Sequence, residues 1–332
     1  MPSGARLKAL TPFPLEFVPA ALAGGVVAVG NFDGMHPGHI ALLEAARAAA
    51  RRLGVPALAL TFEPHPRTVF RPETPVFRLT PLAAKARLMK ALAIDGLVVV
   101  HFDRVFSAMT ADAFIDTILV GRLKLAAAVV GFNFHFGKGR AGAPTVLAEA
   151  GKRLGFAVTV INEVADDGGT PFASTEIRAA LAAGDIGRAN RLLGYRWFVI
   201  GEVIGGQRRG RALGYPTANL ALAADCRLRH GVYAVRLQRP GGAILDGVAN
   251  FGRRPTFDDG APLLEAFLFD FSGDLYGEEV AVTFFDWIRP EEKFPSAAAL
   301  VAAMDRDCEN ARACLGAAGP GSRLDAALAA LG

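Results

Sequence analysis

The sequence is short of cysteine and of long apolar runs, and both shortages exclude classes of protein. Three cysteines occur in 332 residues, at Cys226, Cys308 and Cys314. The last two lack the spacing of a zinc site and indicate helix packing, and disulfides are not expected. The longest apolar runs, such as 97–100 and 126–130, are far too short to cross a bilayer. No basic and then apolar signal segment opens the chain, so we expect a cytoplasmic protein without a membrane partner.

A long block of one charge is also missing. The chain carries 36 Lys and Arg against 32 Asp and Glu, which gives a formal net charge of +4. Its densest basic cluster, Arg208, Arg209 and Arg211, lies among glycines. Basic and aromatic residues do not alternate as they do on surfaces that stack single-stranded nucleic acid. These features favour anionic small molecules such as nucleotides as partners and argue against nucleic acid.

The patterns that are present predict two domains. Hydrophobic residues make up 52% of the chain and charged residues 20%, which is typical of a folded chain. The length is large for one core. Apolar runs at 26–29, 57–62, 97–102, 126–131 and 156–161 alternate with helical patterns at 39–53, 81–93, 110–120 and 145–154. This alternation predicts an α/β doubly wound parallel sheet, whose ligands bind beyond the carboxyl ends of the strands.

The pattern changes after about residue 185. Apolar runs then follow one another without intervening helices, at 197–203, 232–237, 245–250, 263–271 and 279–285. Such a succession predicts a small antiparallel β-barrel. Helical patterns return at 296–313 and 322–331, with a short joint at 315–321. We therefore expect one domain over residues 1–186 and a second over residues 187–332.

The most informative stretch of the first half is VAVGNFDGMHPGH, residues 27–39. A buried strand stops there and a helix begins near Pro37, a residue suited to the first helical turn. The free N–H groups and the dipole of a helix entrance attract anions. His36 and His39 can donate to phosphate oxygens at such a place. Gly34 and Gly38 allow a nucleotide to approach the backbone closely.

Two other interpretations of this stretch stay open. Both histidines could bind a metal together with Asp33, although no further His or Cys cluster completes a coordination shell. Alternatively, the histidines are polar caps without a ligand. The dinucleotide-binding fingerprint and the Walker lysine loop are both absent from the sequence.

The most informative stretch of the second half is GQRRGRALGYPTAN, residues 206–219. Thr217 and Asn219 offer side-chain oxygens two positions apart, and Mg²⁺ prefers such hard ligands. The alternative is a glycine-rich hairpin with both residues in its turn, which composition alone favours. Glu265 lies in the apolar run LLEAF. It is either a functional carboxylate or an outward-facing residue of an alternating strand.

The first half resembles the H-x-G-H nucleotidyltransferases, on the stretch GNFDGMHPGH at residues 30–39. It is most similar to the FMN adenylyltransferase half of bacterial bifunctional riboflavin kinase/FAD synthetases. Three further stretches match that family in order, TFEPHP at 61–66, GFNFHFGKG at 131–139 and STEIR at 174–178.

The second half resembles riboflavin kinases. The matching stretches are PTAN at 216–219, GVY at 231–233, GVANFGRRPT at 247–256, Glu265, DLYG at 274–277 and IRP at 288–290. Together the two resemblances cover about residues 15–314. They imply two successive reactions: phosphorylation of riboflavin by ATP to FMN, then adenylylation of FMN by a second ATP to FAD with release of pyrophosphate.

The resemblance also implies roles for residues. Glu265 is expected to be the general base of the kinase, with Thr217 and Asn219 holding Mg²⁺ at the phosphates of ATP. In the adenylyltransferase, charge on the ATP phosphates is expected to be stabilised by His36, His39, Ser174, Thr175 and Arg178. The remaining expected nucleotide and flavin contacts are Gly30, Phe32, Asp33, Gly34, Gly38, Asn133, Gly210, Arg211, Gly214, Pro216 and Arg289.

One departure from the family lies beside these residues, because a second serine is common where this chain has Ala173. Two alternatives to the bifunctional enzyme stay open. In one, a single activity is live and the other domain serves as a flavin-binding or regulatory module. In the other, the basic barrel binds RNA. A homo-oligomer also stays open, as does the role of residues 316–332.

Overall fold

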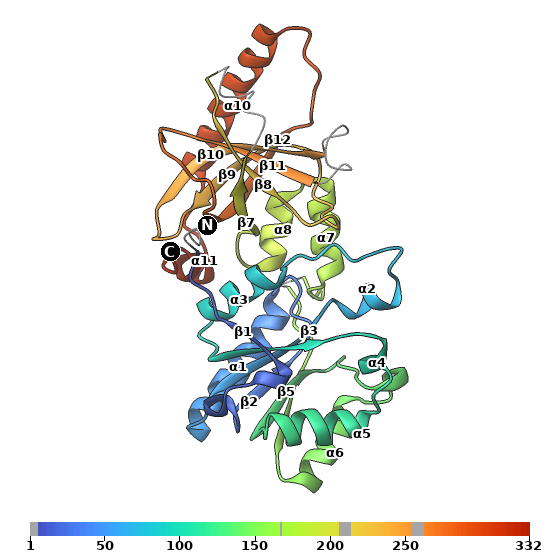
Figure 1. Ribbon diagram of the computed structural model, residues 1–332. Coiled ribbons are helices and arrows are strands. Elements are labelled where there is room, and N and C mark those ends of the chain that lie inside the picture. The colour runs from blue at the N-terminus through green and yellow to red at the C-terminus, as the bar shows by residue number, and fades with distance from the viewer. Residues whose placement is uncertain (1–5, 167, 206–213, 254–261) are drawn as a thin grey trace. The chain divides into compact units, whose positions relative to one another are not determined.

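The computed structural model describes residues 6–166, 168–205, 214–253 and 262–332, and it divides into two compact units (Figure 1). The first, called the sheet unit here, comprises Ala9–Val76 and Thr80–Phe172. The second, called the barrel unit, comprises the described residues from Ala173 to Gly332, residues 6–8 and the short segment Phe77–Leu79. In the part of the chain that is described, no helix has the length and apolarity needed to span a membrane.

Six described strands of the sheet unit form one sheet in the order β1-β4-β3-β2-β5-β6, and all neighbours run parallel. They are β1 (Pro12–Pro14), β2 (Val26–Val29), β3 (Ala57–Glu63), β4 (Gly96–His101), β5 (Ala127–Gly131) and β6 (Ala157–Ile161). Every residue of β2 is buried, as expected of a central strand covered on both faces. The five predicted strands are confirmed. The edge strand β1 was missed because a three-residue segment with two prolines carries no strand pattern.

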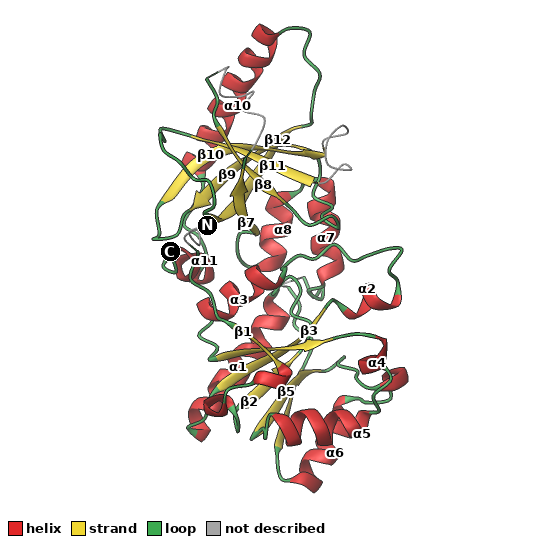
Figure 2. Ribbon diagram, viewed as in Figure 1, coloured by secondary structure: helices red, strands yellow, loops and turns green. Residues whose placement is uncertain are grey.

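Helices cover both faces of this sheet (Figure 2). The helical segments are α1 (Pro37–Leu53), α2 (Pro66–Phe70), α3 (Leu82–Ala91), α4 (Arg104–Ser107), α5 (Ala111–Ala113), the π-helix η3 (Phe114–Arg122) and α6 (Pro144–Leu154), with 3-10 turns η1 (Leu15–Phe17), η2 (Ala20–Leu22) and η4 (Lys138–Arg140). Helix α1 lies against β2, β3 and β5. On the other face, side chains of η3 and α6 such as Ile118 and Leu147 join a core with Val27 and Val98. The predicted doubly wound architecture is therefore confirmed.

The barrel unit contains a closed barrel of described strands in the order β10-β11-β8-β7-β12-β9. They are β7 (Phe198–Ile204), β8 (Thr217–Ala221), β9 (Gly231–Gln238), β10 (Ile244–Arg253), β11 (Pro262–Leu268) and β12 (Glu279–Arg289). All neighbouring pairs are antiparallel, which confirms the predicted barrel. The five predicted runs are strands, although the run expected over 263–271 ends at Leu268. Strand β8 was not predicted.

Helices of the barrel unit are α7 (Ser174–Ala183), α8 (Ile186–Leu193), α10 (Ala297–Ala317) and α11 (Arg323–Ala329). Helix α10 lies against β9, β10 and β12. Its Cys308 and Cys314 contact a core cluster that includes Val248 and Phe269, so the prediction that these cysteines serve helix packing is confirmed. The helix runs four residues beyond its predicted end at residue 313, and the joint before α11 is correspondingly shorter.

The residues after 316, which the family resemblance does not cover, are attached to the barrel. Asp325 of α11 accepts a hydrogen bond from the backbone N–H of Arg196 at 2.9 Å. Gln238 of β9 donates to the carbonyl of Ala329 at 2.7 Å. Leu324 and Leu328 are buried. These contacts make the end of the chain part of the barrel unit's fold.

Candidate active sites

The first candidate site begins at the carboxyl end of β2, in a turn whose backbone is partly left-handed. Phe32 has φ 48°, Gly34 has φ 90° and Met35 has φ 35°. For a non-glycine residue, such a conformation costs about 1–3 kcal/mol and persists only where surrounding contacts enforce it. Phe32 and Met35 are fully buried, and a ring of contacts described below holds the turn. The strain is therefore located where the chain passes from the sheet into α1.

The two histidines follow directly from this turn. His36 occupies the N-cap position of α1 with an extended backbone, and Pro37 is in the first turn of the helix as predicted. The rings of His36 and His39 stack, with centroids 4.0 Å apart and an interplanar angle of 25°. A side chain at Gly38 would place its Cβ 3.2 Å from the His36 ring. Glycine at this position therefore leaves room for the imidazole.

Burial favours the neutral form of both imidazoles. Burial lowers the pKa of His36 to about 4, against the opposing attraction of the Asp33 carboxylate. Burial lowers the pKa of His39 well below its ordinary value, and the nearby His36 and Lys85 lower it further. The Nδ1 atoms of both rings are buried, and neither has a hydrogen-bond partner among the described residues. Unpaired buried polar atoms are unusual and indicate a place prepared for a ligand.

The metal interpretation of this stretch finds no support in the geometry. Among the described residues, no group of three or more His, Cys, Asp or Glu side chains is arranged to hold an ion. Asp33 is instead engaged by Thr80, whose backbone N–H donates to its Oδ1 at 2.9 Å. The carboxylate therefore serves to shape the turn.

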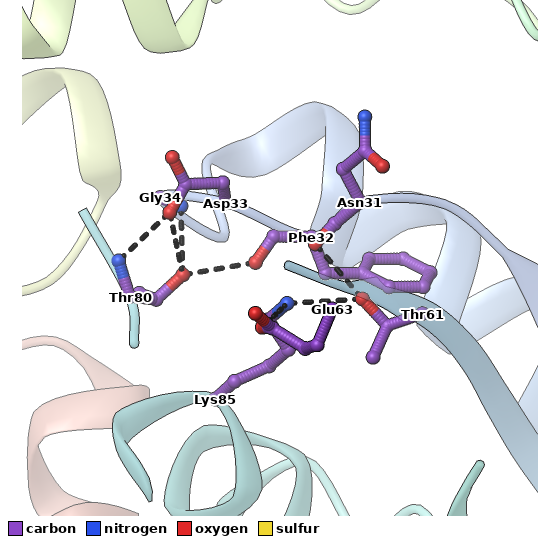
Figure 3. A network of polar contacts seen from close by, with 8 residues as sticks. All are labelled: Asn31, Phe32, Asp33, Gly34, Thr61, Glu63, Thr80 and Lys85. Atoms are coloured by element: carbon purple, nitrogen blue, oxygen red, sulfur yellow. Dashed lines mark hydrogen bonds and ion pairs between the residues drawn. The ribbon is translucent and has the colours of Figure 1, made fainter. Parts of the chain in front are cut away.

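A polar network surrounds the turn (Figure 3), and two of its members, Thr80 and Lys85, were not predicted from the sequence. The Thr80 hydroxyl donates to the carbonyl of Phe32 and accepts from the N–H of Gly34, each at 2.9 Å. The Lys85 ammonium donates to Thr61 at 2.9 Å and to Glu63 at 3.0 Å. Lys85 is 3% exposed. The sequence signal for this network was the lysine inside the predicted helix over 81–93. If that helix covers the sheet, a lysine on its buried side needs polar partners.

Three phenylalanines lie in the loop that follows β5. Residues 132 and 133 form a turn, so Phe132, Phe134 and Phe136 do not lie on one face of a continuous strand. Phe132 is 45% exposed. Phe134 stacks on Phe136 with centroids 5.3 Å apart, and Phe136 belongs to the core. Asn133 is exposed in the same turn. This arrangement is compatible with an apolar wall for a flavin ring.

The late motif of the first half lies at the start of α7, in the barrel unit. Ala173 occupies the N-cap position, where no side chain caps the helix, and Ser174 and Thr175 are its first two residues. Ser174 and Thr175 therefore lie inside the first turn and not at the N-cap position. The Arg178 Nε donates to the carbonyl of Phe77 at 2.7 Å. The expected phosphate contacts of these residues stay a prediction.

The second candidate site is a row of three polar residues on adjacent strands of the barrel. In the register of β11, Glu265 lies opposite Asn219 of β8 on one side and Asn250 of β10 on the other. Directly paired side chains on antiparallel strands share a face and lie about 4.5–5.5 Å apart at Cβ. Residues alternate between buried and half-buried along β11, and Glu265 lies on the half-buried face. The residue is thus outward-facing on an alternating strand, and it stands between two amides.

Thr217 and Asn219 belong to strand β8, so the alternative of a hairpin with both residues in its turn is wrong. The Asn219 amide donates weakly to the Thr217 carbonyl at 3.4 Å. Its Oδ1 is buried and has no hydrogen-bond partner in the described part of the chain. Gly214 has φ 90°, a conformation that favours glycine, and Pro216 immediately precedes the strand. Gly210 and Arg211, the other expected contacts in this stretch, lie outside the described residues.

Arg289 lies at the end of β12, where Asp307 of α10 binds it with two hydrogen bonds of 2.7 Å. These bonds raise the pKa of the guanidinium. The ion pair fastens the helix to the barrel beside the IRP stretch. A nucleotide contact of Arg289 stays a prediction. Asn250, the third member of the row, donates to Glu291 at 3.3 Å, and no role had been expected for it.

The chain combines a helix entrance on a parallel sheet with a polar row on a closed barrel, and the comparisons with known proteins identify it as a two-domain transferase. Two family models match the chain in that order: FAD synthetase over residues 18–176 and riboflavin kinase over residues 193–315. The chain belongs to the family of bifunctional riboflavin kinase/FMN adenylyltransferases, and the predicted enzyme class is confirmed.

Three relatives illustrate this similarity. The bifunctional riboflavin kinase/FMN adenylyltransferase of Haemophilus influenzae is 40% identical, over 88% of this chain and 94% of that protein. The protein of the same description from Pseudomonas fluorescens is 41% identical, over 87% and 93%. A crystal structure titled as a macrolide-efflux protein from Streptococcus pneumoniae has a TM-score of 0.78 and 31% identity. It covers 91% of this chain and 98% of that one.

Proposed function

We propose that this chain makes FAD from riboflavin in two steps, one carried by residues 187–332 and the other by residues 1–186. Residues 187–332 transfer the γ-phosphate of ATP to the 5′-hydroxyl of riboflavin, which yields FMN. Residues 1–186 then join FMN to the AMP part of a second ATP and release pyrophosphate. Both reactions consume ATP, which supports a cytoplasmic location, and neither needs a nucleic-acid or membrane partner.

Adenylyl transfer is supported by the chemistry of the turn and the stacked histidines. A phosphate oxygen of FMN attacks the α-phosphorus of ATP, and the bond to pyrophosphate breaks. The FMN phosphate is already a nucleophile, so no covalent enzyme intermediate is required. A neutral imidazole can donate one hydrogen bond without contributing a full charge. His36 and His39 at the entrance of α1, with Ser174, Thr175 and Arg178, stabilise the charge that develops on the phosphates.

Phosphorylation is supported by the row on the barrel, and this is the observation that carries the kinase assignment. Glu265 accepts the proton of the riboflavin hydroxyl while the γ-phosphoryl group is transferred. The two amides of Asn219 and Asn250, opposite it on the neighbouring strands, restrict where the carboxylate can lie. Asn250 is in turn held by Glu291.

Mg²⁺ fits the residues at the start of the row. The buried Oδ1 of Asn219 has no hydrogen-bond partner among the described residues, and oxygen atoms of this kind are ligands for a hard cation. Thr217 is the next same-side residue of the strand. These two side chains would hold the ion, which neutralises charge on the transferring phosphoryl group.

The test is a flavin chromatogram of the purified protein incubated with riboflavin, ATP and Mg²⁺. We expect FMN first and FAD later, with two ATP consumed for each FAD. Supplying FMN in place of riboflavin should give FAD directly. Accumulation of FMN alone, or no reaction of riboflavin with normal conversion of FMN, would show that one unit lacks its activity.

A further inference from the structure

Two side chains from the segment between β3 and β4 hold the turn that precedes the histidines. Thr80 contacts three consecutive residues of the turn, and Lys85 reaches it through Thr61 (Figure 3). Neither Thr80 nor Lys85 belongs to the GNFDGMHPGH stretch. The turn determines the positions of His36 and His39. The contacts of Thr80 and Lys85 with the turn therefore suggest a function beyond stability.

We call Thr80 and Lys85, with their contacts to the turn, the clamp. Thr80 forms its first half. Its hydroxyl donates to the Phe32 carbonyl and accepts from the Gly34 N–H, each at 2.9 Å. Its own N–H donates to Asp33 at 2.9 Å. Thr80 is 2% exposed, so water does not substitute for these bonds. Since Phe32 and Gly34 both have positive φ, one hydroxyl fixes two residues that would otherwise relax from the left-handed conformation.

Lys85 closes the second half through a directional chain. Its ammonium donates to the Thr61 hydroxyl at 2.9 Å, and that hydroxyl donates to the carbonyl of Asn31 at 3.0 Å. The positive charge polarises the Thr61 hydroxyl and strengthens its bond to the turn. Glu63 balances the charge at 3.0 Å. Lys85 lies close enough to His39 to oppose its protonation.

The clamp ends next to the catalytic groups. Met35, the last left-handed residue of the turn, is followed at once by His36 at the N-cap of α1. A change in the turn therefore moves His36 and the first N–H groups of the helix together. A displacement of about 1 Å in a positioned group can reduce a rate about 100-fold.

We infer that Thr80 and Lys85 are positioning residues for adenylyl transfer, which hold the Asn31–Met35 turn so that His36 and His39 meet the ATP phosphates. This inference rests on the proposed function of the sheet unit. In this proposal, neither Thr80 nor Lys85 contacts the ATP phosphates, and both act through the turn. The kinase reaction of the barrel unit does not depend on them.

The first experiment compares Thr80→Val with Thr80→Ser in the full-length protein. Valine keeps the shape and removes the hydroxyl, so kcat/KM for ATP in FAD formation should fall about 10- to 100-fold. Serine retains the hydroxyl and should restore most of the rate. FMN formation, measured in the same samples, should stay at the wild-type rate.

A control separates positioning from lost stability. Ile118→Val removes one methyl group from the core of the same unit, where Ile118 is 4% exposed, and should lower the thermal unfolding midpoint without slowing FAD formation. If Thr80→Val makes FAD as fast as Ile118→Val, Thr80 has only a structural role and the inference fails for it. His39→Ala separates failure of this inference from failure of the proposed function. Normal FAD formation by that variant would overturn the proposed adenylyltransferase site itself.

The second experiment tests Lys85 independently, including the case in which Thr80→Val does not fold. Lys85→Met removes both the donor to Thr61 and the ammonium that pairs with Glu63. Lys85→Met/Glu63→Gln also removes the charge of Glu63. If Lys85 acts through Thr61, both variants should form FAD slowly and at similar rates. Recovery of the wild-type rate in the double variant would show that Lys85 only neutralises Glu63, and would overturn its positioning role.

Discussion

The two candidate sites are built in opposite ways. In the sheet unit, the histidines and the turn before them come from one contiguous stretch, residues 27–39. In the barrel unit, Asn219, Asn250 and Glu265 come from three strands and meet only when β8 and β10 pair with β11. A contiguous site can be recognised by its local chemistry. An assembled site becomes visible only with the strand register.

The two sites also differ in the polar groups that they present. The helix entrance offers backbone N–H groups and two neutral imidazoles, which suit the oxygens of phosphates. The row on the barrel offers a carboxylate and amide oxygens, which suit a proton and a cation. Loss of one residue in either site should therefore impair one reaction and spare the other.

The largest effect is expected from Glu265→Gln. The change removes the proton acceptor with little change in shape, so FMN formation should fall about 10²–10⁴-fold. FAD formation from supplied FMN should remain at the wild-type rate. Glu202→Gln provides a matched control, because Glu202 is an exposed carboxylate on β7 of the same barrel. An unchanged kinase rate in Glu265→Gln would leave Glu265 as a surface residue of its strand.

His39→Ala should give the opposite result. Removing one preorganised donor from a charged transition state reduces the rate about 10²–10³-fold. Alanine favours helix formation, so α1 should persist. Fed with riboflavin and ATP, the variant should accumulate FMN, which one chromatogram detects. Stoichiometric zinc in the wild type, measured by metal analysis, would restore the metal interpretation.

The sequence allowed prediction of those parts of the fold that depend on local patterns. The buried run of β2 and the Pro37 entrance of α1 were both predicted, because a strand and a helix start have local signals. Strand β8 was missed because Thr217 and Asn219 interrupt its apolar pattern, and pairing with β11 stabilises it instead. Burial of Thr80 and Lys85 was also missed, since their partners lie 22 or more residues away.

Two truncated fragments test whether the barrel unit folds and acts alone. A fragment of residues 187–332 begins inside α8 and lacks Asp185, whose carboxylate accepts from the N–H of Arg188 at 2.9 Å. Asn190 of α8 accepts from Trp197 at 2.8 Å, so fraying of α8 weakens the barrel. A fragment of residues 173–332 keeps the cap and should be more stable by about 1 kcal/mol. Both should convert riboflavin to FMN.

Urea unfolding followed by tryptophan fluorescence measures this difference. Equal midpoints for the two fragments would mean that α7 and the cap of α8 contribute nothing to the barrel. A folded 173–332 fragment that binds ATP and makes no FMN would remove the kinase from this unit altogether.

The smallest effect concerns pH and is confined to the sheet unit. The folded protein holds the pKa of His36 at about 4, whereas an unfolded chain has a histidine pKa of about 6.5. Between these values the unfolded state binds more protons, so stability rises with pH in this window and is lost as pH falls from about 6.5 toward 4.

His36→Asn removes this contribution to the pH dependence of stability. Its thermal unfolding midpoint should decline less steeply than that of the wild type over the same range, by at most a few degrees. Calorimetry of the intact protein at several pH values provides the measurement, and the unfolding of the barrel unit serves as the internal reference. Parallel curves for wild type and His36→Asn would mean that the imidazole takes up its proton in the folded state, and the neutral pair at the helix entrance would have to be abandoned.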